Sequence, residues 1–176
     1  MTRIKAEGTV RLVPDYFHSS IGLTLSLSNV VGEIIAFMKA DPKRHYKITV
    51  GTDSERFASG NADFVTAVVV HRVGNGGRYF WHGAELGPFY TLRDRIIREV
   101  MISLDLGKEL LKSLQVAIRE GSGMPEWDFE IHADIGENGP TNVMIQEVVG
   151  MIRAHNFEPI TKPNSYAASN VADRHV

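Results

Sequence analysis

Four acidic residues that lie far apart in the sequence stand where apolar segments end or inside helical patterns. Asp53 and Asp134 each close an apolar segment, Glu99 lies in a long helical pattern, and Asp173 lies in the C-terminal segment. Hard divalent cations prefer carboxylate oxygens as ligands. The chain has no cysteine, which excludes thiolate ligands and thiol nucleophiles. The four carboxylates therefore indicate hard-cation chemistry.

Two of these carboxylates also have a plain structural interpretation. An Asp that follows a strand often bonds its own backbone in a turn, which would account for Asp53. Glu99 shares a helix face with apolar residues, where a carboxylate needs a partner because burial without one is costly. That partner is either a ligand or a basic neighbour such as Arg95 or Arg98, unless Glu99 lies at an edge of the stripe that water reaches.

Asp134 and Asp173 leave a choice of neighbours. Asp134 shares its strand face with Glu130 and His132 and lies at the carboxyl end of its strand, the edge where ligand sites in open α/β sheets gather. Asn170 comes one helical turn before Asp173 and could replace it as a ligand. The fourth position of the candidate site is therefore Asp173 or Asn170.

The elements that must position these residues can be read from periodicity and turn residues. In chain order they are a helix capped by Ser28 that stops before Asp41, strands over 47–52, 64–72 and 78–82, a helix over 92–119, a strand over 128–134, a helix containing Val143 and Met151, a strand over 158–161, and a terminal helix capped by Asn164 or Ser165. The turn Gly74–Gly77 predicts a hairpin between the second and third strands.

This order predicts an α/β fold with a mixed sheet covered by helices, because three strands that can pair in antiparallel fashion precede alternating helices and strands. Residues 1–27 show no clear pattern, and we interpret them as an N-terminal arm or extension before one domain at 28–176.

Composition sets limits on location and partners. With 43% hydrophobic and 23% charged residues and no cysteine, the chain reads as a globular protein of a reducing cytoplasm. No apolar run is long enough for a membrane helix, and the N-terminus lacks the apolar core of a signal peptide. The net charge of −2 argues against binding nucleic acid by charge alone. It argues less against a metal-dependent nuclease, because bound cations restore positive charge.

Four strings resemble a known group of proteins. They are GTDS at 51–54, FVTAVVVHR at 64–72, HADIG at 132–136 and KPNSYAASN at 162–170. With the helix over 30–38 they resemble the ribonuclease H-like superfamily and, more closely, the bacterial YkuK-like family, a domain of unknown function. The resemblance covers the chain from about residue 18 onward and implies a mixed five-stranded sheet flanked by helices, with an extra N-terminal helix.

The superfamily resemblance implies a nuclease that hydrolyses phosphodiester bonds with two Mg²⁺ or Mn²⁺ ions. Asp53, Glu99 and Asp134 would be catalytic metal ligands, with Asp173 or a neighbour as the fourth. The alternative is a noncatalytic ribonuclease H-like module that binds nucleic acid or a protein partner, since a fold does not fix an activity. The type of nucleic acid and the oligomeric state stay open.

Several side chains could contact a nucleic-acid strand, although each is also consistent with an ordinary surface or core role. They are Arg72, Arg78, Lys162, Arg174, Tyr79 and Trp81. Other catalytic motifs are absent: the sequence has no HExxH, no P-loop lysine motif and no Gly-x-Ser-x-Gly string.

Overall fold

The computed structural model describes residues 13–119, 121 and 123–175. Its elements are β1 (Phe17–Ser19), β2 (Thr24–Leu25), α1 (Leu27–Lys39), β3 (Tyr46–Arg56), β4 (Ala62–Arg72), β5 (Gly77–Leu86), α2 (Leu92–Arg119), β6 (Trp127–Ala133), the short η1 (Asn142–Met144), α3 (Ile145–Ala154), β7 (Glu158–Ile160), η2 (Ala167–Ala172) and η3 (Asp173–His175). Within the described residues, no helix is long and apolar enough to cross a membrane.

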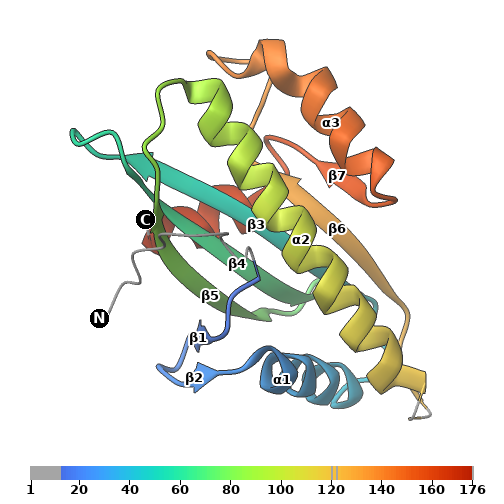
Figure 1. The fold of residues 1–176 in the computed structure, drawn as a ribbon. Coiled ribbons are helices and arrows are strands. Elements are labelled where there is room, and N and C mark those ends of the chain that lie inside the picture. The colour runs from blue at the N-terminus through green and yellow to red at the C-terminus, as the bar shows by residue number, and fades with distance from the viewer. Residues whose placement is uncertain (1–12, 120, 122, 176) are drawn as a thin grey trace.

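The strands form one mixed sheet in the order β2-β1-β5-β4-β3-β6-β7 (Figure 1). β3 pairs antiparallel with β4 and parallel with β6, and β6 pairs parallel with β7. The expectation of a mixed sheet with helices is confirmed, but the expected five strands are seven. The two additional strands come from the segment interpreted as an arm, where β1 pairs with β2 and with the free edge of β5.

Helices cover one face of the sheet and the C-terminal segment covers the other. In Figure 1, α2 crosses in front of the strands and α1 lies below them, whereas the red C-terminal segment lies behind the strands. α1 and α2 bury Ile34, Leu106 and Leu110 in the main core. On the opposite face, Val65 and Ala67 of β4 pack against Ala172. Ala62–Val70 of β4 are all buried, because both faces of this strand are covered.

Two predicted helix starts are wrong. The Ser26 side chain, not that of Ser28, caps α1 by accepting from the Asn29 backbone N–H. The terminal segment is not an α-helix capped by Asn164 or Ser165 but a short π-helical turn, η2, followed by the 3₁₀ turn η3. The hairpin turn is confirmed, and Gly74 and Gly76 adopt φ values of +79° and +74°, which glycine tolerates best.

Candidate functional site

Asp53 and Asp134 lie side by side because of the strand register. The parallel ladder between β3 and β6 ends at the pair Thr52 and Ala133, so the next residue of each strand is one of the two aspartates. β3 continues to Arg56 while paired with β4, which fixes the backbone of Asp53. The two carboxylates therefore lie at the carboxyl end of β6, the position predicted for Asp134. The expectation that Asp53 closes its strand is wrong, because β3 continues past it to Arg56.

Glu99 reaches the same region from α2. It is 7% exposed, and the Ser54 hydroxyl donates to Oε1 at 2.5 Å. Arg95 Nη1 lies 3.8 Å from the same oxygen and donates to Ser54 Oγ at 2.8 Å. Of the two guanidinium partners considered for Glu99, the structure selects Arg95.

The three carboxylates influence one another's protonation. Burial raises the pKa of Glu99 to about 8, against the Ser54 hydrogen bond, and the charges of Asp53 and Asp134 raise it further. Burial also raises the pKa of Asp53 to about 6, and the charges of Asp134 and Asp173 add to that rise. Clustered carboxylates that resist ionisation are expected where a cation is to be bound.

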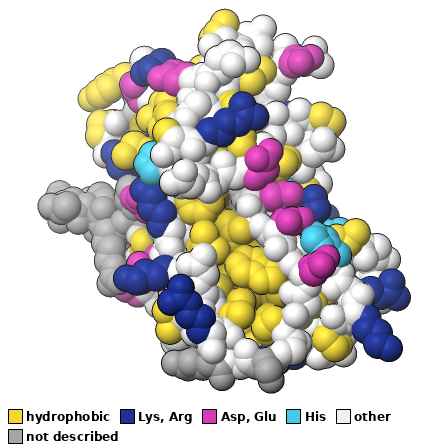
Figure 2. Space-filling model, turned by 90° about the vertical axis from the view of Figure 1, so that its right-hand side faces the viewer, with side chains coloured by type: hydrophobic (Ala, Val, Ile, Leu, Met, Phe, Trp, Pro, Cys, Tyr) yellow, Lys and Arg dark blue, Asp and Glu magenta, His cyan; other side chains and the backbone are white. Residues whose placement is uncertain are grey.

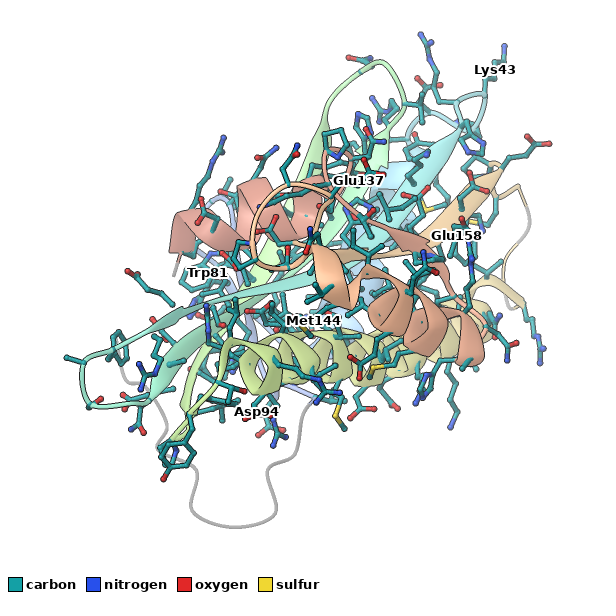
Figure 3. All side chains as sticks on the ribbon, turned by 90° about the horizontal axis from the view of Figure 1, so that it is seen from above. Lys43, Trp81, Asp94, Glu137, Met144 and Glu158 are labelled. Carbon is teal, nitrogen blue, oxygen red and sulfur yellow. The ribbon has the colours of Figure 1, made fainter. Side chains whose placement is uncertain are left out.

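Asp173 is exposed in η3. Its charge raises the pKa of Asp53, so it lies close enough to act on the site. The neighbouring His175 ring stacks on Trp81 of β5 with a centroid distance of 4.2 Å and an interplanar angle of 9°. Figure 3 shows Trp81 beside the C-terminal segment. This stack holds η3 on the sheet.

Lys162 joins the site from the connection between β7 and η2. Its Nζ lies 3.0 Å from Asp134 Oδ2, and the Asp134 side chain is 20% exposed. The other carboxylate oxygen, Asp134 Oδ1, is buried and has no hydrogen-bond partner among the described residues. A buried acceptor without a donor is costly, and a bound cation or water would satisfy it.

The donor chemistry fits a hard divalent cation, since Asp53, Glu99, Asp134 and Asp173 all present carboxylates and Asp134 Oδ1 needs a partner. The side chains nevertheless point to protein partners. Over 13–119, 121 and 123–175, no three His, Asp or Glu side chains are grouped closely enough to hold a metal ion.

A second polar network fixes the C-terminal segment against the site. Ala167 N–H donates to His132 Nδ1 at 3.1 Å, so the proton of the neutral ring is on Nε2, which lies 3.1 Å from Glu130 Oε2. Lys47 Nζ lies 2.9 Å from the other Glu130 oxygen. His132 bonding and then Lys47 lower the pKa of Glu130 to about 2. His132 thus positions η2.

Most of the side chains considered for nucleic-acid contact have structural partners. Arg72 lies over the Phe37 ring at 4.5 Å, Arg78 pairs with Glu33 at 2.7 Å, and Trp81 is stacked on His175. Figure 2 shows one face of the molecule with basic, acidic and histidine side chains spread around a band of hydrophobic ones. Charge on this face is mixed, in keeping with the net charge of −2.

Sequence reasoning missed Ser54 as a partner of Glu99. A signal for it exists, because Ser54 follows Asp53 and alternation along a strand places it on the opposite face, toward α2. The pairing of Lys162 with Asp134 had no local signal. It depends on the Lys162 N–H donating to the Ile135 carbonyl at 2.8 Å, which brings two segments together that are distant in the sequence.

Comparison with known proteins agrees with this geometry. A sequence profile described as "Ribonuclease H-like" matches residues 29–176. The "Uncharacterized protein YkuK" of Bacillus subtilis (strain 168) is 31% identical over 166 residues, which cover 90% of this chain and 95% of that protein. No solved structure matches the chain. The resemblance to YkuK-like proteins is confirmed, and the chain belongs to the ribonuclease H-like family.

Proposed function

We propose that this protein is a divalent-metal-dependent nuclease that hydrolyses phosphodiester bonds of nucleic acid. The observation that carries the proposal is the convergence of Asp53, Glu99 and Asp134 from β3, α2 and β6, with mutual electrostatic effects on the pKa values of Asp53 and Glu99. Membership of the ribonuclease H-like family supports the same activity.

The positions of the site residues suggest which of them would bind metal ions and which would position a ligand. Asp53, Glu99 and Asp134 would be the main ligands of the ions, with Asp173 as the fourth. When bound, Mg²⁺ or Mn²⁺ would supply charge that activates water and stabilises the leaving oxygen. Ser54 and Arg95 hold the Glu99 carboxylate on the α2 side of the site. Asp53 lies inside β3, where partial burial raises the pKa of its carboxyl group to about 6.

A noncatalytic module that binds nucleic acid or a protein is the second candidate. The observation that favours it is that cationic side chains of the protein already lie beside two of the acidic groups, Lys162 at Asp134 and Arg95 at Glu99. In that case the acidic cluster would be a fixed, structural set of ion pairs. It would neither catalyse a reaction nor bind divalent cations.

The test is a cleavage panel of single-stranded and duplex DNA, RNA, RNA–DNA hybrid and branched DNA, with Mg²⁺ or Mn²⁺ and with EDTA. The variants are Asp53→Asn and Asp134→Asn, and the matched control is Asp128→Asn. Asp128 lies on the same strand as the site but is exposed and pairs with His45. We expect metal-dependent cleavage that both site variants lose and the control keeps.

Equal cleavage by Asp53→Asn and wild type would overturn the assignment of the site. If the panel shows no cleavage and calorimetry shows no Mn²⁺ uptake, the noncatalytic module is the better account. Far-UV circular dichroism of each variant separates loss of chemistry from loss of fold.

A further inference from the structure

A groove with a volume of about 670 Å³ opens beside the candidate site. It lies between the connection from β6 to α3, the start of α3, the Lys162 turn and η2, and its lining includes Glu137, Asn138, Ile145, Lys162, Pro163 and Asn170. Figure 3 labels Glu137 and Met144, two residues of the β6–α3 connection. Its volume falls within the range of pockets that hold small ligands, roughly 300–1,000 Å³.

Lys162 connects the groove to the carboxylates. Its side chain crosses Gly136, where an added Cβ would come within 2.9 Å of the Lys162 Cβ. Its Nζ pairs with Asp134 at 3.0 Å while the side chain remains 49% exposed. An ammonium group has three donors, and Asp134 is its only ion-pair partner among the described residues. The remaining donors can take an oxygen of a ligand in the groove.

The other lining residues differ in chemistry from Lys162. Asn138 and Asn170 are exposed, and an amide side chain can both donate and accept hydrogen bonds. Ile145 and Pro163 contribute apolar surface, against which a sugar or a base can pack. A cation, two amides and an apolar wall together suit a ligand that carries one phosphate and a polar, flat body.

We propose that this groove binds one nucleotide of a single nucleic-acid strand, with a phosphate on Lys162 and the sugar or base between Asn138 and Asn170. The proposal rests on the proposed nuclease function and deepens it, because the groove places the strand next to Asp134. Lys162 also offsets the repulsion between the Asp134 carboxylate and the approaching phosphate.

Glu137 allows the proposal to be tested by the direction in which a substitution changes strand affinity. Its exposed carboxylate stands at the same groove, so it disfavours a second phosphate there. Removing this charge should strengthen binding of a strand, whereas removing the charge of Lys162 should weaken it. The two substitutions thus have opposite expected effects on one equilibrium.

The experiment measures binding of the oligonucleotide d(T)8 in EDTA, where cleavage does not occur, by calorimetry and by NMR of the labelled protein. The variants are Lys162→Gln and Glu137→Gln, and the matched control is Lys108→Gln. Lys108 is also 49% exposed and pairs with Asp105 at 3.7 Å, but it lies on α2 away from the groove.

We expect Lys162→Gln to weaken d(T)8 binding by roughly fivefold or more, and Glu137→Gln to strengthen it. Lys162→Gln should also reduce the slope of log K against log[salt] by about 0.7, the value for one phosphate contact on a single strand. Lys108→Gln should change neither quantity. Amide shifts should centre on 136–138 and 162–170, and the mononucleotide dTMP should bind more weakly than d(T)8.

Equal effects of Lys162→Gln and Lys108→Gln, or shifts centred elsewhere, would overturn the groove assignment. Equal affinity for dTMP and d(T)8 would also overturn it, because the site would then take a free nucleotide. These outcomes are separate from the nuclease test: metal-dependent cleavage that Asp53→Asn and Asp134→Asn both lose supports the nuclease whatever the groove binds. Strand binding without any cleavage would keep the groove and remove the nuclease.

Discussion

At the scale of single residues, Glu99 is buried, although the proposed role as a metal ligand needs its ionised carboxylate. Its pKa of about 8 means that, without a cation, most of the population is protonated at neutral pH. A divalent cation would have to displace that proton, so affinity for the cation should rise with pH up to about 8. The ionised form of Glu99 that would bind a cation is thus the form that lowers the stability of the folded protein, so function and stability conflict at this residue.

Replacing Glu99 with Gln should therefore stabilise the protein at high pH. The pKa of Glu99 is raised by folding from 4.5 to about 8, so its stabilising contribution is complete below pH 4.5 and is lost as the pH rises through 8. Glu99→Gln does not ionise and should be more stable than wild type at pH 8, by roughly 1–4 kcal/mol, and similar at pH 5.

Urea unfolding in EDTA from pH 5 to pH 9 measures this difference. The control is Glu109→Gln, an exposed position of the same helix, whose stability should run parallel to that of wild type. A Glu99→Gln curve that also runs parallel to wild type would show that Glu99 ionises freely in the folded protein.

At the scale of elements, the C-terminal segment is held by side chains from strands rather than by its own helix. His132 accepts from Ala167 N–H, the Tyr166 ring meets the His132 ring edge-on with centroids 4.7 Å apart, and His175 stacks on Trp81. η2 is a single short turn, so these contacts fix where Asp173 and Asn170 lie.

His132→Ala should loosen η2 without unfolding the sheet. The Ala167 N–H would lose its acceptor and Glu130 would lose one of its two partners, at a cost of about 1–3 kcal/mol. Hydrogen exchange followed by mass spectrometry should show faster exchange in 165–172 and little change in β3 and β4. His155→Ala, at the exposed histidine that follows the C-terminal end of α3, is the control. Unchanged exchange in 165–172 would mean that other contacts hold η2.

The elements that sequence predicted well are those whose own residues determine them. β4 is a run of β-branched residues buried along its length, and α2 has an apolar stripe over its full predicted range. β1 and β2 are only three and two residues long. They are strands because β1 pairs with the edge of β5, so no periodic pattern in their own residues predicts them. The Ala-rich end looked helical, but contacts with the sheet decided its conformation.

The candidate site shows the same division. Predicted strand ends and a predicted helix face identified Asp53, Glu99 and Asp134 as candidates. The strand register of the structure explains why Asp53 and Asp134 lie side by side. The orientation of each carboxylate could not be predicted, because Ser54, Arg95 and Lys162 set it through contacts between distant segments. The metal ligand roles and the choice between Asp173 and Asn170 remain predictions.

At the scale of the whole molecule, the N-terminal hairpin closes one edge of the sheet. β1 pairs with β5 through His18 and Trp81 and through Ser19 and Phe80, and Phe17 is fully buried in the main core. An open edge of a sheet invites pairing with other chains. The hairpin thus protects β5 at the opposite side of the sheet from β7.

Phe17→Ala should lower global stability by about 3–5 kcal/mol, the usual cost of emptying a buried aromatic site. We expect a lower melting temperature by circular dichroism and a shift toward dimers or larger species by light scattering, since β5 would lose its cover. Binding of d(T)8 below the melting transition should stay unchanged because the groove lies elsewhere. The control is Tyr90→Ala at an aromatic residue that is 83% exposed. An equal melting temperature for both variants would contradict a structural role for Phe17.

The late position of Lys162 and η2 in the chain has a consequence during translation. β3 and β6 leave the ribosome first, so Asp53 and Asp134 are present before the ammonium group that pairs with Asp134. Val65 and Ala67 are likewise synthesised before Ala172, which covers them in the folded protein. A nascent chain that ends before Lys162 therefore exposes Asp134 without its ammonium partner and leaves Val65 and Ala67 uncovered, and such exposed apolar surface favours aggregation.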